Sequence, residues 1–319
     1  MLFKPLLLGI CLSTCCFAYT VGAAPLAFIT NQQSGNVTVI NTSNNAVEAT
    51  IPVGKEPAGV SVDNIGKYAF VSNPGDGSVS VIDISELKVV RNLNTGPGPL
   101  ALLAVGDRLF VADWYDDYVS IIDTRSWETE ANVAVGRSPS GLVISPDKHT
   151  LYVSIRDDNL VVAIDTRTLK LTAKVETGER PFGMKLSTDG RTLYVANVMS
   201  NSISVIDTQA MQLKAHVSVG ERPYAVSLAL NDSRAFVTNQ YDDTVSIIDT
   251  TTLKPIGLID VEEYPEGINT HCDDLHVYVA NWFSNTVTVF NARTGEITDT
   301  IDTGDSPRAY GNFITSQTD

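Results

Sequence analysis

Three arginines and one glutamate beside regularly spaced prolines are the residues of this sequence best suited to chemistry. Arg180 and Arg222 each precede such a proline, whereas Glu266 and Arg308 each follow one. Guanidinium groups can stabilise negative charge that develops on a carbonyl oxygen, and a carboxyl group can accept or release a proton. We therefore predict Glu266, Arg222, Arg308 and Arg180 as catalytic residues. The reaction would need no cofactor and would be of the isomerase, lyase or cyclase type, including a cycloaddition of secondary metabolism.

Aromatic residues and a further arginine would form the walls of the same site. They flank the same prolines or lie in a second set of loops that emerges on the same face. Flat rings and guanidinium groups suit a small aromatic or anionic organic molecule better than a metal ion. The predicted ligand-binding residues are Phe182, Tyr224, Trp114, Arg156, Tyr241, Tyr264, Trp282 and Phe283.

Two other interpretations of these residues stay open. The side chains could merely cover the mouth of a central channel. The protein could also be a non-catalytic binding or scaffold protein at the cell surface or in the periplasm, with a protein or carbohydrate partner on the same face. A site near the axis favours small-molecule chemistry, whereas aromatic residues spread over the rim favour a partner surface.

The candidate residues share one register because the sequence repeats itself roughly every 40 residues, the length typical of a propeller blade. One marker is a proline at positions Pro57, Pro99, Pro139, Pro181, Pro223, Pro265 and Pro307. The other is an aromatic residue in a hydrophobic run, at Phe28, Phe70, Phe110, Tyr152, Tyr194, Phe236 and Tyr278. Two markers in phase predict an all-β, seven-bladed β-propeller.

The unit that starts at Pro181 shows four strands. Residues 182–186 alternate and reach a tight-turn signal, which predicts the innermost strand and its hairpin. Residues 193–197 and 203–208 follow as the second and third strands, with β-branched residues at alternate positions in the third. Residues 215–219 form the outer strand. Blades of four strands are therefore expected.

The ends of the chain predict how the ring closes. The propeller begins at a second strand, residues 26–31, and ends with a first strand, residues 309–314. We expect the C-terminal strand to pair with the N-terminal strands and complete their blade, which removes the open edges that promote aggregation.

The repeat resembles the YVTN family of seven-bladed propellers, named for a Tyr-Val-Thr-Asn strand. Close versions occur at residues 194–197, 236–239 and 278–281, and residues 205–208 supply a Val-Ile-Asp-Thr segment. The resemblance covers residues 24–319 and implies the fold. It does not imply one activity, because related propellers include cell-surface proteins, redox domains, lactonases and lyases.

The first 23 residues are interpreted as a secretory signal. An apolar stretch follows Lys4 and ends in small residues before Ala24, and it is too short for a membrane span. Residues 24–319 would then form a single propeller that is secreted or periplasmic. A lipoprotein acylated at Cys15 or Cys16 is the alternative. Cys272 would be the one cysteine of the exported protein.

Charge and motif spacing argue against several classes. The formal net charge of −15 and the lack of a basic cluster disfavour nucleic-acid binding. The four histidines do not converge on the predicted register, so haem, zinc and copper sites are not expected, and no metal is predicted. The acidic stretches fail the calcium-loop pattern. Glycosylation sequons occur at Asn231, Asn36 and Asn41, and they matter only in a eukaryote.

Overall fold

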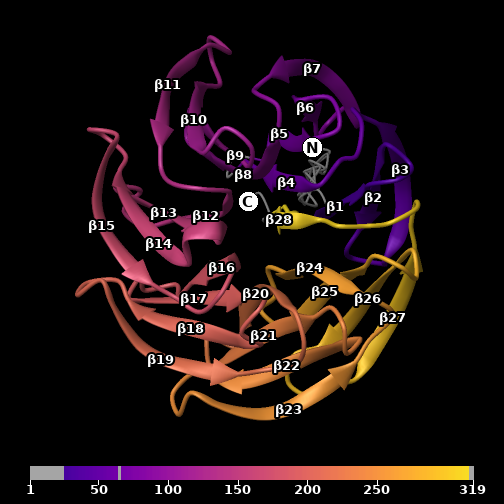
Figure 1. The fold of residues 1–319 in the computed structure, drawn as a ribbon. Coiled ribbons are helices and arrows are strands. Elements are labelled where there is room, and N and C mark those ends of the chain that lie inside the picture. The colour runs from indigo at the N-terminus through magenta and orange to yellow at the C-terminus, as the bar shows by residue number, and fades with distance from the viewer. Residues whose placement is uncertain (1–24, 64–65, 316–319) are drawn as a thin grey trace, which may run out of the picture.

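The computed structural model describes residues 25–63 and 66–315, and regular structure in this part of the chain is almost entirely β-strand. Figure 1 shows seven sheets arranged around a central axis as the blades of a propeller. The 3-10 helix Arg156–Asp158 is the exception among the described elements. The predicted all-β, seven-bladed fold is confirmed. The predicted signal, residues 1–23, lies outside the described residues.

The first four blades follow one another around the ring, with strands numbered from the axis outward. Blade 1 contains β1 (Leu26–Asn31), β2 (Asn36–Asn41) and β3 (Ala46–Pro52). Blade 2 contains β4 (Gly59–Val62), β5 (Tyr68–Asn73), β6 (Ser78–Asp83) and β7 (Lys88–Asn94). Blade 3 contains β8 (Pro99–Val105), β9 (Arg108–Asp113), β10 (Tyr118–Asp123) and β11 (Thr129–Ala134). Blade 4 contains β12 (Pro139–Ile144), β13 (Thr150–Ile155), β14 (Leu160–Asp165) and β15 (Lys170–Glu176).

The remaining blades repeat the same order. Blade 5 contains β16 (Pro181–Leu186), β17 (Thr192–Asn197), β18 (Ser202–Asp207) and β19 (Gln212–Ser218). Blade 6 contains β20 (Pro223–Ala229), β21 (Arg234–Asn239), β22 (Thr244–Asp249) and β23 (Lys254–Asp260). Blade 7 contains β24 (Pro265–Thr270), β25 (His276–Asn281), β26 (Thr286–Asn291) and β27 (Ile297–Asp302). The last strand of the chain is β28 (Tyr310–Asn312).

The repeated aromatic residue of each second strand fills the space between neighbouring blades. Phe70 belongs to one buried cluster with Leu102 and Leu109 of blade 3, and Tyr194 shares a cluster with Val226 and Leu228 of blade 6. Each buried aromatic ring removes apolar surface from water and packs two sheets together. The sequence marker is therefore a blade-packing residue.

The C-terminal segment closes the ring, as expected. Antiparallel hydrogen bonds run from the Phe28 amide to the Phe313 carbonyl and from the Arg308 amide to the Thr30 carbonyl, at 2.9 and 2.8 Å. The structure adds a second contact, because β28 also pairs in parallel with β4 of blade 2 (Figure 1). Gly311 has a φ of +119°, and a Cβ there would meet the Val60 carbonyl oxygen at 2.4 Å, so glycine permits this approach.

An asparagine ends the second strand in five blades and holds the third strand. In blade 5 the Asn197 amide nitrogen donates to the hydroxyls of Ser202 and Ser204, at 3.2 and 2.9 Å. Asn31, Asn73, Asn239 and Asn281 each make the corresponding pair of bonds. These asparagines are buried, which fits a structural role.

No helix within residues 25–63 and 66–315 combines the length and hydropathy needed to cross a membrane.

Candidate functional site on the loop face

The loop face consists of the turns that precede each inner strand and the turns that join the second strand to the third. The residue before the repeat proline has a left-handed backbone, with φ of 54–59°, at Glu56, Ser138, Arg180, Arg222, Tyr264 and Ser306. A side chain from the preceding blade holds most of these turns. Its carbonyl or carboxylate oxygen accepts the backbone N–H in the pairs Asp117–Ser138, Asn159–Arg180, Asn201–Arg222, Asp243–Tyr264 and Asn285–Ser306. We call this contact the turn brace.

Aromatic rings fill the axis at the loop face. The Phe182 ring lies 4.5 Å from Tyr224 and 5.0 Å from Tyr310, and Tyr224 lies 5.6 Å from Tyr310, between ring centroids. Trp114 adds a fourth ring, 5.8 Å from Phe182. We call these four residues the axial aromatic cluster. Phe182, Tyr224 and Tyr310 are buried, so the rings pack against one another rather than line an open pocket.

A buried ion pair lies beside this cluster. Arg308 donates from Nε to Glu266 Oε2 at 2.6 Å and from Nη2 to the Tyr224 hydroxyl at 2.7 Å. Gln240 Nε2 donates to the other oxygen of Glu266 at 2.9 Å. Glu266 is only 4% exposed. Two of the predicted catalytic residues, Glu266 and Arg308, and one predicted wall, Tyr224, are therefore brought together in a single polar network.

Burial and charge act in opposite directions on this network. Desolvation raises the pKa of Glu266, and Arg308 and the hydrogen bond from Gln240 only partly oppose it. Burial also raises the pKa of the Tyr224 and Tyr310 hydroxyls well above the ordinary value, so both stay protonated and can donate hydrogen bonds. Burial acts to lower the pKa of Arg308. The interactions with Glu266 and Tyr224 outweigh this effect and raise the pKa.

The other predicted arginines do not join the network. Arg180 is exposed on the rim. The Arg222 guanidinium lies over the Tyr241 ring, 5.1 Å from its centroid, and contacts the Met199 sulfur. Arg156 lies over Trp114 at 4.9 Å and pairs with Asp157 at 2.8 Å, and desolvation lowers its pKa. These three arginines are spread around the rim.

The remaining predicted aromatic residues form a rim cluster across blades 6 and 7. The Tyr264 ring lies 5.8 Å from Tyr241, 5.7 Å from Trp282 and 4.9 Å from Phe283. Tyr241 and Phe283 are 56% and 58% exposed, and Tyr115 of blade 3 is 70% exposed on the same face. Exposed aromatic residues at a rim suit contact with a ligand or a partner.

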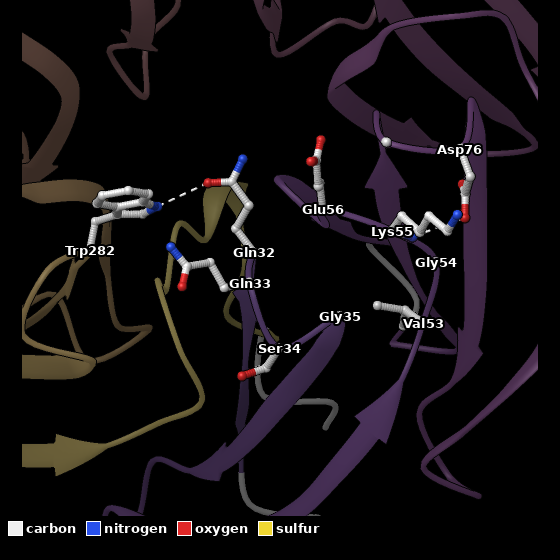
Figure 2. Close-up of a pocket in the computed structure, with 11 residues that line it drawn as sticks. Gln32, Gln33, Ser34, Gly35, Val53, Gly54, Lys55, Glu56, Asp76 and Trp282 are labelled. Atoms are coloured by element: carbon white, nitrogen blue, oxygen red, sulfur yellow. Dashed lines mark hydrogen bonds between the residues drawn. The ribbon is translucent and has the colours of Figure 1, made fainter.

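A groove of about 750 Å³ opens beside Trp282, between blades 1 and 2 (Figure 2). The Trp282 indole N–H donates to Gln32 Oε1 at 3.0 Å, which fixes the ring at one end of the groove. Polar side chains supply much of the lining, namely Gln32, Gln33, Lys55, Glu56 and Asp76. The brace position of this junction is Gly35, which has no side chain to brace the turn at Glu56.

Several of these residues were not predicted. Gln32 and Gln240 directly follow a second strand, as Trp114, Arg156 and Trp282 do. A comparison of all seven blades at that one position would have found both. Tyr310 lies deeper in its strand than Phe182 and Tyr224, and nothing in the repeat marks it.

Two histidines meet at the hairpin ends of the blades, opposite the loop face. His271 and His276 both bond Asp273, with Nδ1–Oδ2 distances of 3.1 and 2.6 Å, so these two do come together. Burial acts to raise the pKa of Asp273, but the bonds from His276 and backbone amides lower it to about 2. No group of three metal-ligating side chains occurs in the described residues. Cys272 is exposed there as a free thiol.

The three sequons differ in exposure. Asn231 is exposed, whereas Asn36 and Asn41 are partly buried. Asn36 accepts a bond from Asn31, and Asn41 donates to Glu48, so Asn231 presents the most accessible amide.

Comparisons with known proteins support a propeller of seven blades. The family described as "Lactonase, 7-bladed beta-propeller" matches residues 117–228. Hydrazine synthase of Kuenenia stuttgartiensis is similar in structure, with a TM-score of 0.78, 18% identity, and coverage of 88% of this chain and 99% of that one. A functionally unknown protein of Desulfotomaculum acetoxidans gives a TM-score of 0.73 at 14% identity, with coverage of 90% and 99%. At these identities the likeness concerns the fold. A comparison with curated proteins found no match.

Proposed function

We propose that this propeller binds a small organic molecule on its loop face, in the groove beside Trp282. The ligand class is an aromatic or anionic compound with polar substituents. The observation that carries the proposal is Trp282, whose ring is fixed by Gln32 at the edge of a groove lined by amides and charged groups. An oriented aromatic wall with a few polar groups is the usual composition of a small-molecule site.

Replacing Trp282 with alanine is expected to weaken ligand binding about 30-fold or more, because a tryptophan at the centre of a contact commonly contributes about 2 kcal/mol. Ligands would first be found by a thermal-shift screen of aromatic and carboxylate compounds. Affinity would then be measured by calorimetric titration. Tyr115→Ala, which removes an exposed loop-face ring of blade 3, is the matched control. Equal affinity of Trp282→Ala and the native chain would contradict the proposal.

A second candidate function is catalysis at the Glu266–Arg308 pair by an isomerase, lyase or cyclase mechanism. The specific observation is a buried carboxyl with a raised pKa beside a guanidinium and a protonated tyrosine. A carboxyl of raised pKa can act as a general acid, and the two donors can stabilise an oxyanion. The match to the lactonase propeller family supports an enzymatic role, although its residues 117–228 end before this pair.

Replacing Glu266 with glutamine is expected to lower turnover of a bound compound by roughly 100-fold or more, the usual cost of losing a general acid or base. Products would be followed by mass spectrometry. Glu221→Gln, which alters an exposed loop-face carboxylate, provides the control. Unchanged turnover in Glu266→Gln would show that this pair is not catalytic. A binding function would then be the better interpretation.

We also propose that the protein acts outside the cytoplasm, on the basis of the signal-like residues 1–23. Fractionation of cells that express the full chain, with N-terminal sequencing of the product, tests export directly.

A further inference from the structure

The axis contains two adjoining cavities on the far side of the axial aromatic cluster from the loop face. The first, of about 320 Å³, runs from Tyr310 along the inner strands. The second, of about 400 Å³, extends to Lys148 and Cys272 at the hairpin ends of the blades. Both include Leu103, Ile144, Lys185, Asn269 and Asn312, so they form one channel. Figure 1 shows the inner strands β4, β8, β12, β16, β20 and β24 nearest the centre of the ring.

The channel walls are mostly aliphatic, and Lys185 places a cation among them. Its lining includes Leu102, Leu142, Met184, Val226 and Ile268. Lys185 takes part in no ion pair or side-chain hydrogen bond within residues 25–63 and 66–315. Desolvation lowers its pKa, and only Asp232 acts in the opposite direction. Lys185 is partly buried, and a partly desolvated ammonium without an ion-pair partner gains from a bound anion.

Two amides and a second lysine line the same channel as Lys185. Asn269 Nδ2 donates to the Gly311 carbonyl at 3.1 Å and to Asn312 Oδ1 at 3.2 Å, which orients the Asn312 amide. The Asn312 Nδ2 group makes no bond to the described residues, and it borders both cavities. Lys148 lines the outer cavity. The acidic lining residue, Asp63, accepts backbone N–H groups from Lys67 and Tyr68.

We propose that this channel binds a small organic carboxylate with an apolar chain, which enters from the hairpin ends of the blades. Lys185 is the counter-ion, Asn312 donates a hydrogen bond, and the aliphatic walls hold the chain. The chain as a whole carries a net charge of −15, whereas the channel lining includes the two lysines Lys148 and Lys185. This local positive charge favours an anionic ligand in the channel. The site is separate from the loop face and does not depend on its function.

Calorimetric titration of the purified full-length chain with hexanoate tests the proposal. We expect saturable binding of hexanoate to the native chain. The affinity should fall roughly 10- to 100-fold in Lys185→Met, the usual effect of losing a hydrogen bond to a charged group. The neutral analogue hexanamide should bind more weakly by a similar factor. Lys174→Met, on the exposed outer strand of blade 4, and Trp282→Ala should both retain hexanoate binding.

Absence of saturable hexanoate binding, equal binding of hexanamide, or unchanged affinity of Lys185→Met would each overturn the proposal. Thermal unfolding gives a second readout, because hexanoate should raise the Tm of the native chain and not that of Lys185→Met. If Lys185→Met does not fold, Lys185→Gln replaces it, with the same expected loss of affinity.

Discussion

Replacing Arg308 with methionine is expected to lower the free energy of unfolding by about 3–5 kcal/mol, the usual cost of breaking a buried ion pair on one side. Glu266 is 4% exposed, and without Arg308 its carboxylate would keep only the bond from Gln240. Urea denaturation measures the effect. Arg222→Met, on the same face but over the Tyr241 ring, is the matched control and should change stability much less.

The decrease in the free energy of unfolding caused by Arg308→Met should depend on pH in a defined direction. Burial already raises the pKa of Glu266 above its ordinary value of 4.5, and removal of the guanidinium raises it further. A carboxyl with a raised pKa stabilises the fold below its unfolded pKa, and this stability is lost as the pH rises through the folded pKa. The deficit should therefore be small near pH 4 and grow toward pH 8.

The double variant Glu266→Leu/Arg308→Met separates the ion pair from its packing. With both charges removed, no unpaired carboxylate is buried, so the double variant should be more stable than Arg308→Met at pH 8. Two outcomes would contradict the role assigned to the Glu266–Arg308 pair. One is an equal loss of unfolding free energy in the two variants, and the other is a loss in Arg308→Met that does not change with pH.

Deletion of residues 307–319 is expected to abolish cooperative unfolding and to cause aggregation. The deletion removes the strand that bonds β1 and β4, together with the buried side chains of Phe313 and Ile314. It leaves unpaired edges at the axis, and such edges associate with other chains. Thermal unfolding followed by circular dichroism, with size-exclusion chromatography, measures both effects.

A synthetic peptide of residues 307–315 supplies the control for this deletion. Added in trans, it should restore a monomeric, cooperatively unfolding protein, whereas a peptide with Phe313→Asp should not, because a carboxylate would have to be buried among apolar residues. A cooperative monomer without any peptide would show that ring closure is not needed for folding.

The fold could be predicted from the sequence because its markers are packing requirements that recur in every blade. Phe70 and its equivalents fill the gap between sheets, so each copy must keep an aromatic residue at that place. Ring closure followed from the strands at the two ends. The contact between β28 and β4 was not predicted, because it depends on a backbone approach at Gly311 that leaves no repeating pattern.

The candidate site was only partly predictable. The repeat register shows which face a residue belongs to, and it correctly brought Glu266 and Arg308 to the same face as Tyr224. It gives no side-chain direction, so Arg180 was grouped with Arg308, although Arg180 is exposed and Arg308 is part of the buried network. Nor does it show whether rings such as Phe182 and Tyr310 leave a space or fill it, which depends on packing in three dimensions.

The groove beside Trp282 also records how an internally repeated protein can diversify. At Asp117 and its four equivalents a side chain ties one copy to the next, and Gly35 lacks that tie while keeping the same left-handed backbone, with φ of +63°. Asparagine tolerates this conformation, as Asn159 shows with φ of +57°. Gly77 occupies the same position at the junction of blades 2 and 3, with φ of +68°, so two of the repeated junctions dispense with the side-chain tie and keep the turn.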